Sequence, residues 1–202
     1  MEANMHGHMA YFPAGTPSMG VLDDPDLLLI NAGLPSDTFN IVCRAQLVPH
    51  TLEARIDFAI DHFRSRNLPM AWWVGPTSRP ADLGLHLERH GLTCTEHHTG
   101  MAADLHELAV GAPDPPGLTV RPVANRGELR RFSTVISSIF DPPDPAVPLF
   151  YEQVADLARM IHGGCCGGAA QPGGGLRADA AGILAGPPLP AWCSALRVNH
   201  AG

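Results

Sequence analysis

Two histidines in the stretch "HLERH", His86 and His90, have the spacing of a metal-binding pair. Residues four positions apart on a helix share one face, so both imidazole rings point to the same side. Glu88 stands at the wrong offset for the H-E-x-x-H pattern of zinc proteases. His97 and His98 would add ligands only if a hairpin folded back over the helix. We therefore interpret all four as surface histidines and predict no metal site.

Two carboxylates, Asp141 and Asp144, lie in the proline-rich stretch "DPPDPAVP". Paired acids in a cleft can exchange protons with a substrate. In a loop of this composition the same residues more often form solvated turns, and the sequence favours that second interpretation. The adjacent Cys165 and Cys166 lack the spacing of a C-x-x-C redox or zinc motif.

The tryptophans of "MAWWV", Trp72 and Trp73, alternate along a predicted strand and therefore face opposite sides of it. Packing on both faces of a covered strand is the interpretation that we favour. The sequence contains no G-x-S-x-G, Walker or dinucleotide-binding glycine loop. The stretch "QPGGGL" approaches a pyrophosphate loop of the form Q/R-x-x-G-x-G/A, but Leu176 stands where Gly or Ala is needed, and no readable strand precedes it.

Composition and charge exclude several classes of protein. The chain has 202 residues, 45% of them apolar, which allows a buried core. Its formal net charge of −7 argues against a nucleic-acid-binding or anionic-membrane surface. It has no apolar run long enough to span a membrane and no secretory signal at "MEANMHGHMAYF". Five irregularly spaced cysteines, Cys43 and Cys94 among them, predict free thiols and a cytoplasmic protein.

Hydrophobic periodicity predicts an α/β fold over residues 20–110, after a loose N-terminal segment over 1–19. The expected strands and helices alternate along this unit. Strands are predicted at 27–31, 40–44, 70–74, 92–99 and 101–105, and helices at 51–66 and 78–91.

The pattern restarts after a linker over residues 111–117, which is rich in proline and glycine. A strand is predicted at 118–123, and helices at 125–140 and 149–161. Asn125 is the expected N-cap of the first of these helices. One face of that helix carries four apolar residues: Leu129, Phe132, Ile136 and Ile139.

Periodicity then ends. Residues 162–202 are rich in glycine, alanine and proline, and the glycines would weaken a helix or a strand, so an irregular tail is predicted there. A short strand around Ile183 is the one candidate element in it.

Four stretches, in this order and spacing, resemble the GNAT-type N-acetyltransferases, most of all bacterial ones with a diverged N-terminal half before the catalytic domain. They are "GLPSDTFNIVCRAQL" (33–47), "LPMAWWVGPTSRPADLGLHLERHGL" (68–92), "TGMAADLHEL" (99–108) and "GLTVRPVANRGELRRFSTVISSIF" (117–140). The resemblance covers residues 20–161. It implies an N-terminal GNAT-like unit over 20–110, with a mixed sheet and flanking helices. Residues 118–161 would be the opening strand and two helices of an incomplete catalytic unit.

In that family an amine receives an acetyl group from acetyl-CoA. A strand splays from its neighbour, and the thioester carbonyl lies in the opening, polarised by a backbone N–H. A loop of the form Q/R-x-x-G-x-G/A opens a helix whose amides hold the pyrophosphate. The segment between the first two helices lines the amine pocket. The resemblance therefore makes Phe140, Asp141, Asp144 and Tyr151 the candidate cleft residues, with the amine of a small molecule or of a protein as the acceptor.

The change of composition after His162 is typical of a reading-frame shift in a GC-rich gene, and a natural low-complexity tail would have the same composition. We expect a GNAT-family acetyltransferase by descent that is C-terminally truncated or frameshifted. Because the acetyl-CoA loop is not readable, we expect the chain not to bind acetyl-CoA and to be inactive. The alternative is a non-catalytic module that binds a small molecule or a protein.

Overall fold

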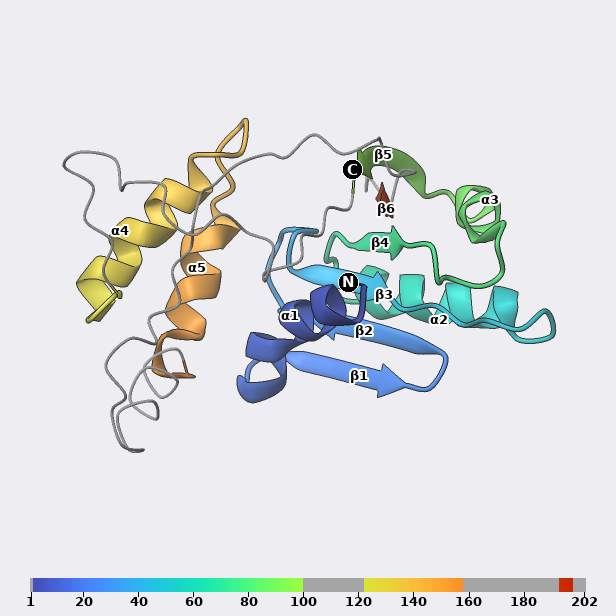
Figure 1. Cartoon of the computed structure of the whole chain (residues 1–202), viewed down its shortest axis with the longest axis horizontal. Helices are drawn as coiled ribbons and strands as arrows, with labels where there is room; N and C mark the ends of the chain where they lie inside the picture. Colours follow the sequence, from blue (N-terminus) through green and yellow to red (C-terminus); the bar gives the residue numbers. More distant parts are fainter. Residues whose placement is uncertain (1, 100–121, 158–192, 198–202) are drawn as a thin grey trace, which may run out of the picture.

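The computed structural model of the chain describes residues 2–99, 122–157 and 193–197 (Figure 1). These residues form an α/β structure in which helices flank a mixed, six-stranded sheet. The strands are β1 (Gly20–Asp24), β2 (Leu27–Asn31), β3 (Asn40–Cys43), β4 (Ala71–Val74), β5 (Thr93–His98) and β6 (Cys193–Arg197). The helices are α1 (Glu2–Gly15), α2 (Leu52–Arg64), α3 (Leu83–Arg89), α4 (Arg126–Ser137) and α5 (Ala146–Gln153).

The strand order in the sheet is β1-β2-β3-β4-β6-β5. The first three strands form an antiparallel meander. β3 and β4 are parallel, because α2 carries the chain back across the sheet between them. Their pairing is short and joins Ile41 to Ala71 and Val42 to Trp72. β6 lies between β4 and β5 and is antiparallel to both.

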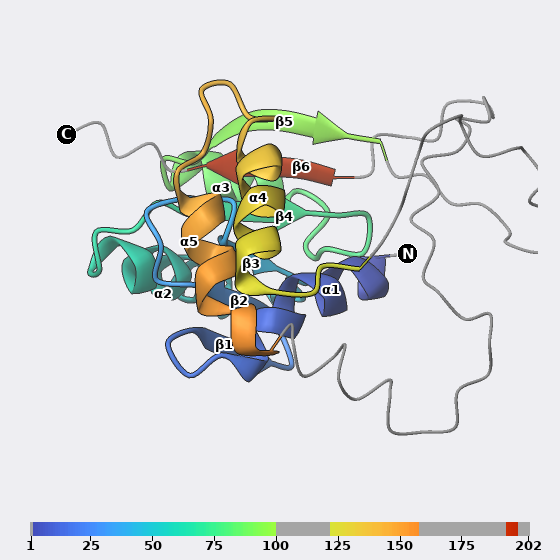
Figure 2. The same ribbon diagram turned by 90° about the vertical axis from the view of Figure 1, so that its left-hand side faces the viewer.

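Strand alternation divides the core between the two faces of the sheet. Val42 and Trp72 face α2 and α3 and belong to the largest buried cluster, with Ile56 and Phe63 of α2. Ile41 faces the other way, with Met9 of α1 and the half-buried Trp73 packed on the same side. Figures 1 and 2 show α1 against this second face, and α4 and α5 side by side at one end of the molecule. The predicted division of Trp72 and Trp73 between opposite faces is confirmed.

Several predicted elements are confirmed to within a few residues. They are the strands at 27–31, 40–44 and 70–74, the strand at 92–99, and the helix at 51–66. The helix expected at 78–91 is shorter and begins at Leu83, after a turn. Asn125 caps α4 as expected, because its side chain accepts a hydrogen bond from the Glu128 N–H at 3.0 Å. Neither Cys43 nor Cys94 forms a disulfide with another described residue.

The expectation of a loose segment over residues 1–19 is wrong, because Glu2–Gly15 forms α1. This helix has no apolar stripe of regular period, so its sequence gives no helical signal. Instead, His6 and Pro13 are buried in it, and its Phe12 packs edge-on against Phe150 of α5 at 6.2 Å between ring centroids. Packing against the sheet and α5 therefore stabilises α1, which the sequence pattern does not identify as a helix.

The prediction of an irregular tail over 162–202 is wrong at its end, because Cys193–Arg197 forms β6. This strand pairs with β4 along residues 71–74 and with β5 along residues 93–98. Both partners are about a hundred residues or more away in the sequence, and such non-local pairing leaves no trace in the composition of the segment.

The two helices of the second predicted unit pack on the first unit. Phe150 of α5 and Val154, the residue that follows this helix, are buried with Ala32 and Leu34, which follow β2. The predicted apolar face of α4 is only partly buried: Leu129 and Ile136 are half-buried, whereas Phe132 is 42% exposed and Ile139, just after the helix, is 71% exposed. α4 instead buries Ser133 and Ser137, whose small side chains let it approach α5 closely. Their hydroxyls donate to the backbone oxygens of Arg130 and Asp144.

The second helix was expected at 149–161; α5 begins earlier, at Ala146, and residues after Leu157 lie outside the described part of the chain. Several other predictions fall there as well. They are the strand at 101–105, the linker at 111–117, residues 118–121 of the next predicted strand, Cys165 and Cys166, the stretch Gln171–Leu176 and the strand around Ile183. Among the described residues, no helix is both long enough and apolar enough to cross a bilayer.

Candidate functional site

A cleft of about 910 Å³ opens between the sheet face that carries α1 and the loop that joins α4 to α5. Its volume lies within the range of small-molecule sites. Ile41 and Trp73 line it at the sheet, and His8 lines it on α1. All four cleft residues expected from the sequence line it: Phe140, Asp141, Asp144 and Tyr151.

Aromatic rings form much of the wall of this cleft. Phe39 stacks on Phe150 at 4.3 Å between centroids and 10° between planes. Trp73 stacks on His98 at 4.9 Å and 27°. The rings come from β4, β5, α5 and the residue before β3, so the secondary structure fixes their positions. A wall of stacked rings is well suited to a flat or cationic organic ligand.

The charged residues of the lining are acidic. Among the described residues that line the cleft, four carry carboxylates and none is lysine or arginine. The four are Asp37, Glu96, Asp141 and Asp144. Glu96 contacts the ring of His98 at 2.8 Å. Since the other titratable groups in the wall are histidines and a tyrosine, the cleft favours a cation over an anion.

Asp144 holds the α4–α5 loop in place. Its carboxylate accepts a hydrogen bond from the Ser36 hydroxyl at 2.6 Å and one from the Ala146 N–H, at the start of α5, at 2.8 Å. The Thr38 hydroxyl lies at 3.4 Å from the same carboxylate. These bonds use the oxygens of Asp144, so its role in the described part of the chain is structural.

Asp141 differs from Asp144 in its surroundings. Its side chain is exposed and makes no hydrogen bond or ion pair with another described residue. Tyr151 is half-buried, and burial raises the pKa of its phenol above the usual value. The phenol therefore stays neutral near pH 7 and can donate a hydrogen bond, while Asp141 can accept one.

Sequence reasoning missed the part of the cleft that comes from α1 and from the sheet. Trp73 was interpreted as packing, although its place opposite Trp72 was predicted. His98 was interpreted as a surface histidine, and it is both exposed and stacked on Trp73. The alternation of β4 was the available signal, because it sets Trp73 on the face away from the main core.

A second region lies at the carboxyl ends of β3 and β4, beyond their last paired residues. The Arg79 N–H donates to the Ala45 carbonyl at 2.9 Å, and the Arg79 carbonyl accepts from the Leu47 N–H at 3.0 Å. Gln46 and Arg79 thus form a parallel bridge outside the named strands. The Gln46 side chain also donates to the Thr77 carbonyl at 2.6 Å. The segment after β4 therefore fills the space beside the end of β3.

The turn from β3 into α2 has few backbone donors left for a ligand. The N–H groups of Gln46 and Leu47 donate to the backbone oxygens of Asp26 and Arg79. The Thr51 N–H donates to the Val48 carbonyl at 3.0 Å. Pro49 has no N–H at all.

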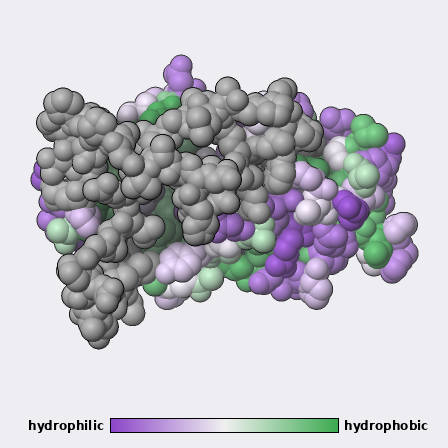
Figure 3. Space-filling view, viewed as in Figure 1, coloured by the Kyte–Doolittle hydropathy of each residue, from purple (hydrophilic) through white to green (hydrophobic). Residues whose placement is uncertain are grey.

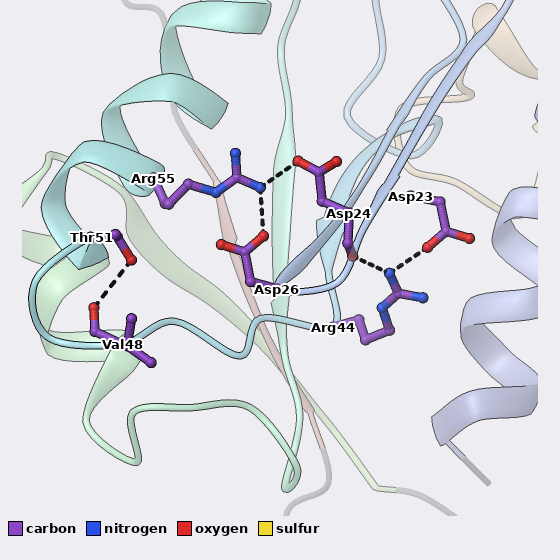
Figure 4. A network of polar contacts seen from close by, with 7 residues as sticks. All are labelled: Asp23, Asp24, Asp26, Arg44, Val48, Thr51 and Arg55. Atoms are coloured by element: carbon purple, nitrogen blue, oxygen red, sulfur yellow. Dashed lines mark hydrogen bonds and ion pairs between the residues drawn. The ribbon is translucent and has the colours of Figure 1, made fainter.

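The cations near the start of α2 are paired with carboxylates (Figure 4). Arg55 contacts Asp24 and Asp26 at 2.7 Å each. Arg44 binds the carboxylate of Asp23 and donates to the Asp24 backbone oxygen at 2.6 Å. Both guanidinium groups therefore tie the turn between β1 and β2 to the segments around α2.

The predicted histidine pair lies on one face of α3, with His86 and His90 both in contact with the carboxylate of Glu53 on α2. His97 and His98 lie on β5. Within the described parts of the chain, no group of three or more His, Cys, Asp or Glu side chains is arranged to hold a metal ion.

Comparison of the chain with known protein families, with curated proteins and with solved structures finds no match.

Proposed function

We propose that this chain is a GNAT-like protein that binds a small-molecule amine in its aromatic cleft and does not transfer acetyl groups. The resemblance of residues 20–161 and the acidic cleft support the first half of the proposal. The region where β3 and β4 end supports the second half.

The arrangement of the sheet supports a GNAT-like unit. β3 and β4 are parallel neighbours joined through α2, and only two residue pairs link them. In the family, two neighbouring strands separate in this way, and the thioester lies in the opening. The loop that precedes the family's pyrophosphate helix would then correspond to the turn before α2.

The amino-acid sequence of that turn departs from the GNAT pattern. Residues 46–51 read "QLVPHT", where the family has Q/R-x-x-G-x-G/A. Gln46 matches the first position, but Pro49 takes the place of the glycine and Thr51 the place of the last Gly or Ala. Pro49 removes a donor, and the Thr51 N–H is already used within the turn. A pyrophosphate needs several aligned N–H groups at a helix start, so this turn is a poor site for acetyl-CoA.

The observation that carries the proposal is a pair of backbone hydrogen bonds, one from the Arg79 N–H to the Ala45 carbonyl and one from the Leu47 N–H to the Arg79 carbonyl. They occupy the backbone groups beside the end of β3, where the family's opening between strands would lie. A cofactor would have to break both bonds before it entered. Each buried donor or acceptor left without a partner costs about 1–3 kcal/mol, which opposes entry.

The cleft lies at the other ends of the same strands, where Ala71 begins β4 and Phe39 precedes β3. Its volume and its rings remain available whether or not the β3–β4 opening is filled. An amine with an apolar body suits it, because Asp141 supplies an unpaired carboxylate and Trp73 supplies a ring face.

The test is a calorimetric titration of the full chain with tryptamine, an amine with a flat aromatic body. We expect saturable binding that Trp73→Leu weakens about tenfold and Asp141→Asn weakens about fivefold. Phe58→Leu and Asp61→Asn are the matched controls, because both residues are exposed on α2 and neither lines the cleft. Absence of saturable binding, or binding unchanged by both cleft variants, would contradict the proposal.

A further inference from the structure

A cluster of two histidines and two carboxylates joins α2 to α3, away from the cleft. Glu53 is in the first turn of α2, and its two oxygens contact different rings: Oε1 lies 2.8 Å from His86 Nδ1, and Oε2 lies 2.5 Å from His90 Nε2. The other ring nitrogen of His90, Nδ1, lies 3.0 Å from Asp57 Oδ1. His90 is thus held between two carboxylates that lie one turn apart on α2.

The charge of the His90 ring decides how strongly this geometry is held. His90 is hydrogen-bonded to Glu53 through Nε2, and its Nδ1 lies within ion-pair distance of Asp57. As the imidazolium the ring attracts both carboxylates, whereas the neutral ring carries no charge to attract them. His86 bonds to Glu53 through Nδ1 alone, since its Nε2 is 3.6 Å from Asp82, and the neutral ring suffices for that one bond.

The two helices lead directly out of the bridged region at the ends of β3 and β4. α2 begins at Leu52, after the segment of Ala45 and Leu47, and α3 begins at Leu83, shortly after Arg79. A contact that holds α2 against α3 therefore also holds these segments against each other.

We propose that Glu53, Asp57, His86 and His90 form a pH-sensitive clamp between α2 and α3, fully closed when the His90 ring carries both protons. The clamp does not depend on the function proposed for the cleft. Histidine generally loses its second proton near neutral pH, which puts the switch between mildly acidic and mildly alkaline conditions.

Few titratable side chains contact the two histidine rings of the clamp. Among the described residues, the titratable side chains in contact with the two rings are Glu53 and Asp57 from α2 and Asp82 beside α3. The neighbouring Glu88 and Arg89 are exposed on α3 and make no contact with either ring. Hydrophilic and hydrophobic residues are mixed at the right-hand end of the view in Figure 3, where α3 lies. The side chains of Glu53 and Asp57 are 58% and 63% exposed, so protons reach the cluster from solvent.

The Glu53 carboxyl and the His90 ring limit the clamp at opposite ends of the pH range. Hydrogen bonds from His90 and then from His86 lower the pKa of the Glu53 carboxyl. A lowered carboxyl pKa contributes stability above the unfolded value, about 4.5, and that stability is lost as the pH falls through the lowered folded value. The attraction between His90 and the two carboxylates requires the charged ring, so we expect it in mild acid and not with the neutral ring. The clamp is therefore strongest in mildly acidic solution above about pH 4.5.

The test compares urea unfolding of the full chain and of His90→Asn at about pH 5.5 and about pH 8. At the lower pH the variant should have an unfolding constant about fivefold higher than the unchanged chain, and at the higher pH the two should nearly agree. Other titrating groups are common to both proteins and cancel in the ratio. The control is His50→Asn in the exposed turn before α2, whose ratio should be the same at both pH values.

A second variant tests whether the charge of the His90 ring closes the clamp. Asp57→Asn removes one of the two carboxylates that attract the imidazolium, so the stability ratio between this variant and its own His90→Asn double variant should change less with pH than it does in the unchanged chain. If the variants do not fold, ring ¹⁵N shifts of His90 in the unchanged chain should show both nitrogens protonated at about pH 5.5 and one at about pH 8. A ring that is neutral at both values, or a stability ratio that does not change with pH, would overturn the clamp. Zinc-dependent stabilisation that is lost in His86→Asn would overturn it too, because the nitrogens would then be ligands and not donors.

Discussion

Arg79 donates its backbone N–H to the carbonyl of Ala45 across 2.9 Å, at the ends of two parallel strands that no longer pair with each other. This bond and its companion from Leu47 join the chain's own backbone at the carboxyl ends of β3 and β4. The aromatic cleft, as the described residues define it, is lined by Phe39 and Ala71 at the opposite ends of these strands.

Asp144 and Asp141 line the same cleft, and we expect their replacement to affect stability very differently. Asp144→Ala removes the acceptor for Ser36 and for the first turn of α5, and it should lower the free energy of unfolding by about 1–2 kcal/mol. Asp141→Ala is the matched control, and its exposed side chain predicts a change within about 0.5 kcal/mol. Chemical denaturation of both variants measures the difference. Equal effects would show that Asp144 does not anchor the loop.

Asn125 should be the residue that fixes the start of α4. Its side chain accepts from the Glu128 N–H, and the Glu128 carboxylate reaches back to the Ala124 N–H at 2.8 Å, which makes a reciprocal cap. Asn125→Ala should cost about 1 kcal/mol of stability, whereas Asn125→Asp should keep most of it. Thermal melts of the two variants distinguish them, and equal melting temperatures would show that the cap is not formed.

His6 should make the protein less stable in mild acid. Burial lowers the pKa of His6, with Glu2 opposing that shift and Arg44 adding to it. A lowered histidine pKa means that the unfolded chain binds the proton more readily, so this contribution to stability is complete above about pH 6.5 and is lost as the pH falls through the lowered value. His6→Gln should therefore flatten the decline in stability between about pH 7 and about pH 5. His8→Gln, exposed on the same helix, should leave that decline unchanged, and a similar slope in both variants would contradict the assignment.

The glycine positions of the β3–α2 turn offer a test of the loop comparison. Pro49→Gly with Thr51→Gly gives the turn the residue types of the GNAT loop with which we compare it, and it also increases the freedom of the unfolded chain. We expect a loss of about 1–2 kcal/mol in stability and no gain of acetyl-CoA binding, because Arg79 still occupies Ala45 and Leu47. Micromolar binding by this double variant would show that the turn alone had blocked the cofactor.

The sequence predicted those elements whose signals lie within a few neighbouring residues. The alternation around Trp72 and Trp73, the apolar stripe of α2 and the cap at Asn125 all follow from neighbours within a few residues. Periodicity did not predict α1 or β6, because docking on the sheet determines α1 and pairing with β4 and β5 determines β6. The burial of Ser133 and Ser137 likewise depends on α5.

The candidate site divides in the same way. The acidic loop of Asp141 and Asp144 was identified from sequence, but the rings of Trp73 and His98 join it only through the sheet. The turn at residues 46–51 gives no signal in the sequence, because proline and threonine stand where a GNAT pyrophosphate loop has glycine or alanine. Its proposed correspondence to that loop rests on its place between β3 and α2.

The most direct test of the account is a calorimetric titration of the unmodified 202-residue chain with acetyl-CoA, with tryptamine titrated into the same preparation as the positive control. The account predicts saturable heat with tryptamine and none with acetyl-CoA in the micromolar range, because the backbone groups at the ends of β3 and β4 already pair with each other. One-to-one binding of acetyl-CoA with a micromolar Kd would contradict it. If Gly174→Val then abolished that binding, the pyrophosphate loop would lie in the glycine-rich stretch at 171–176.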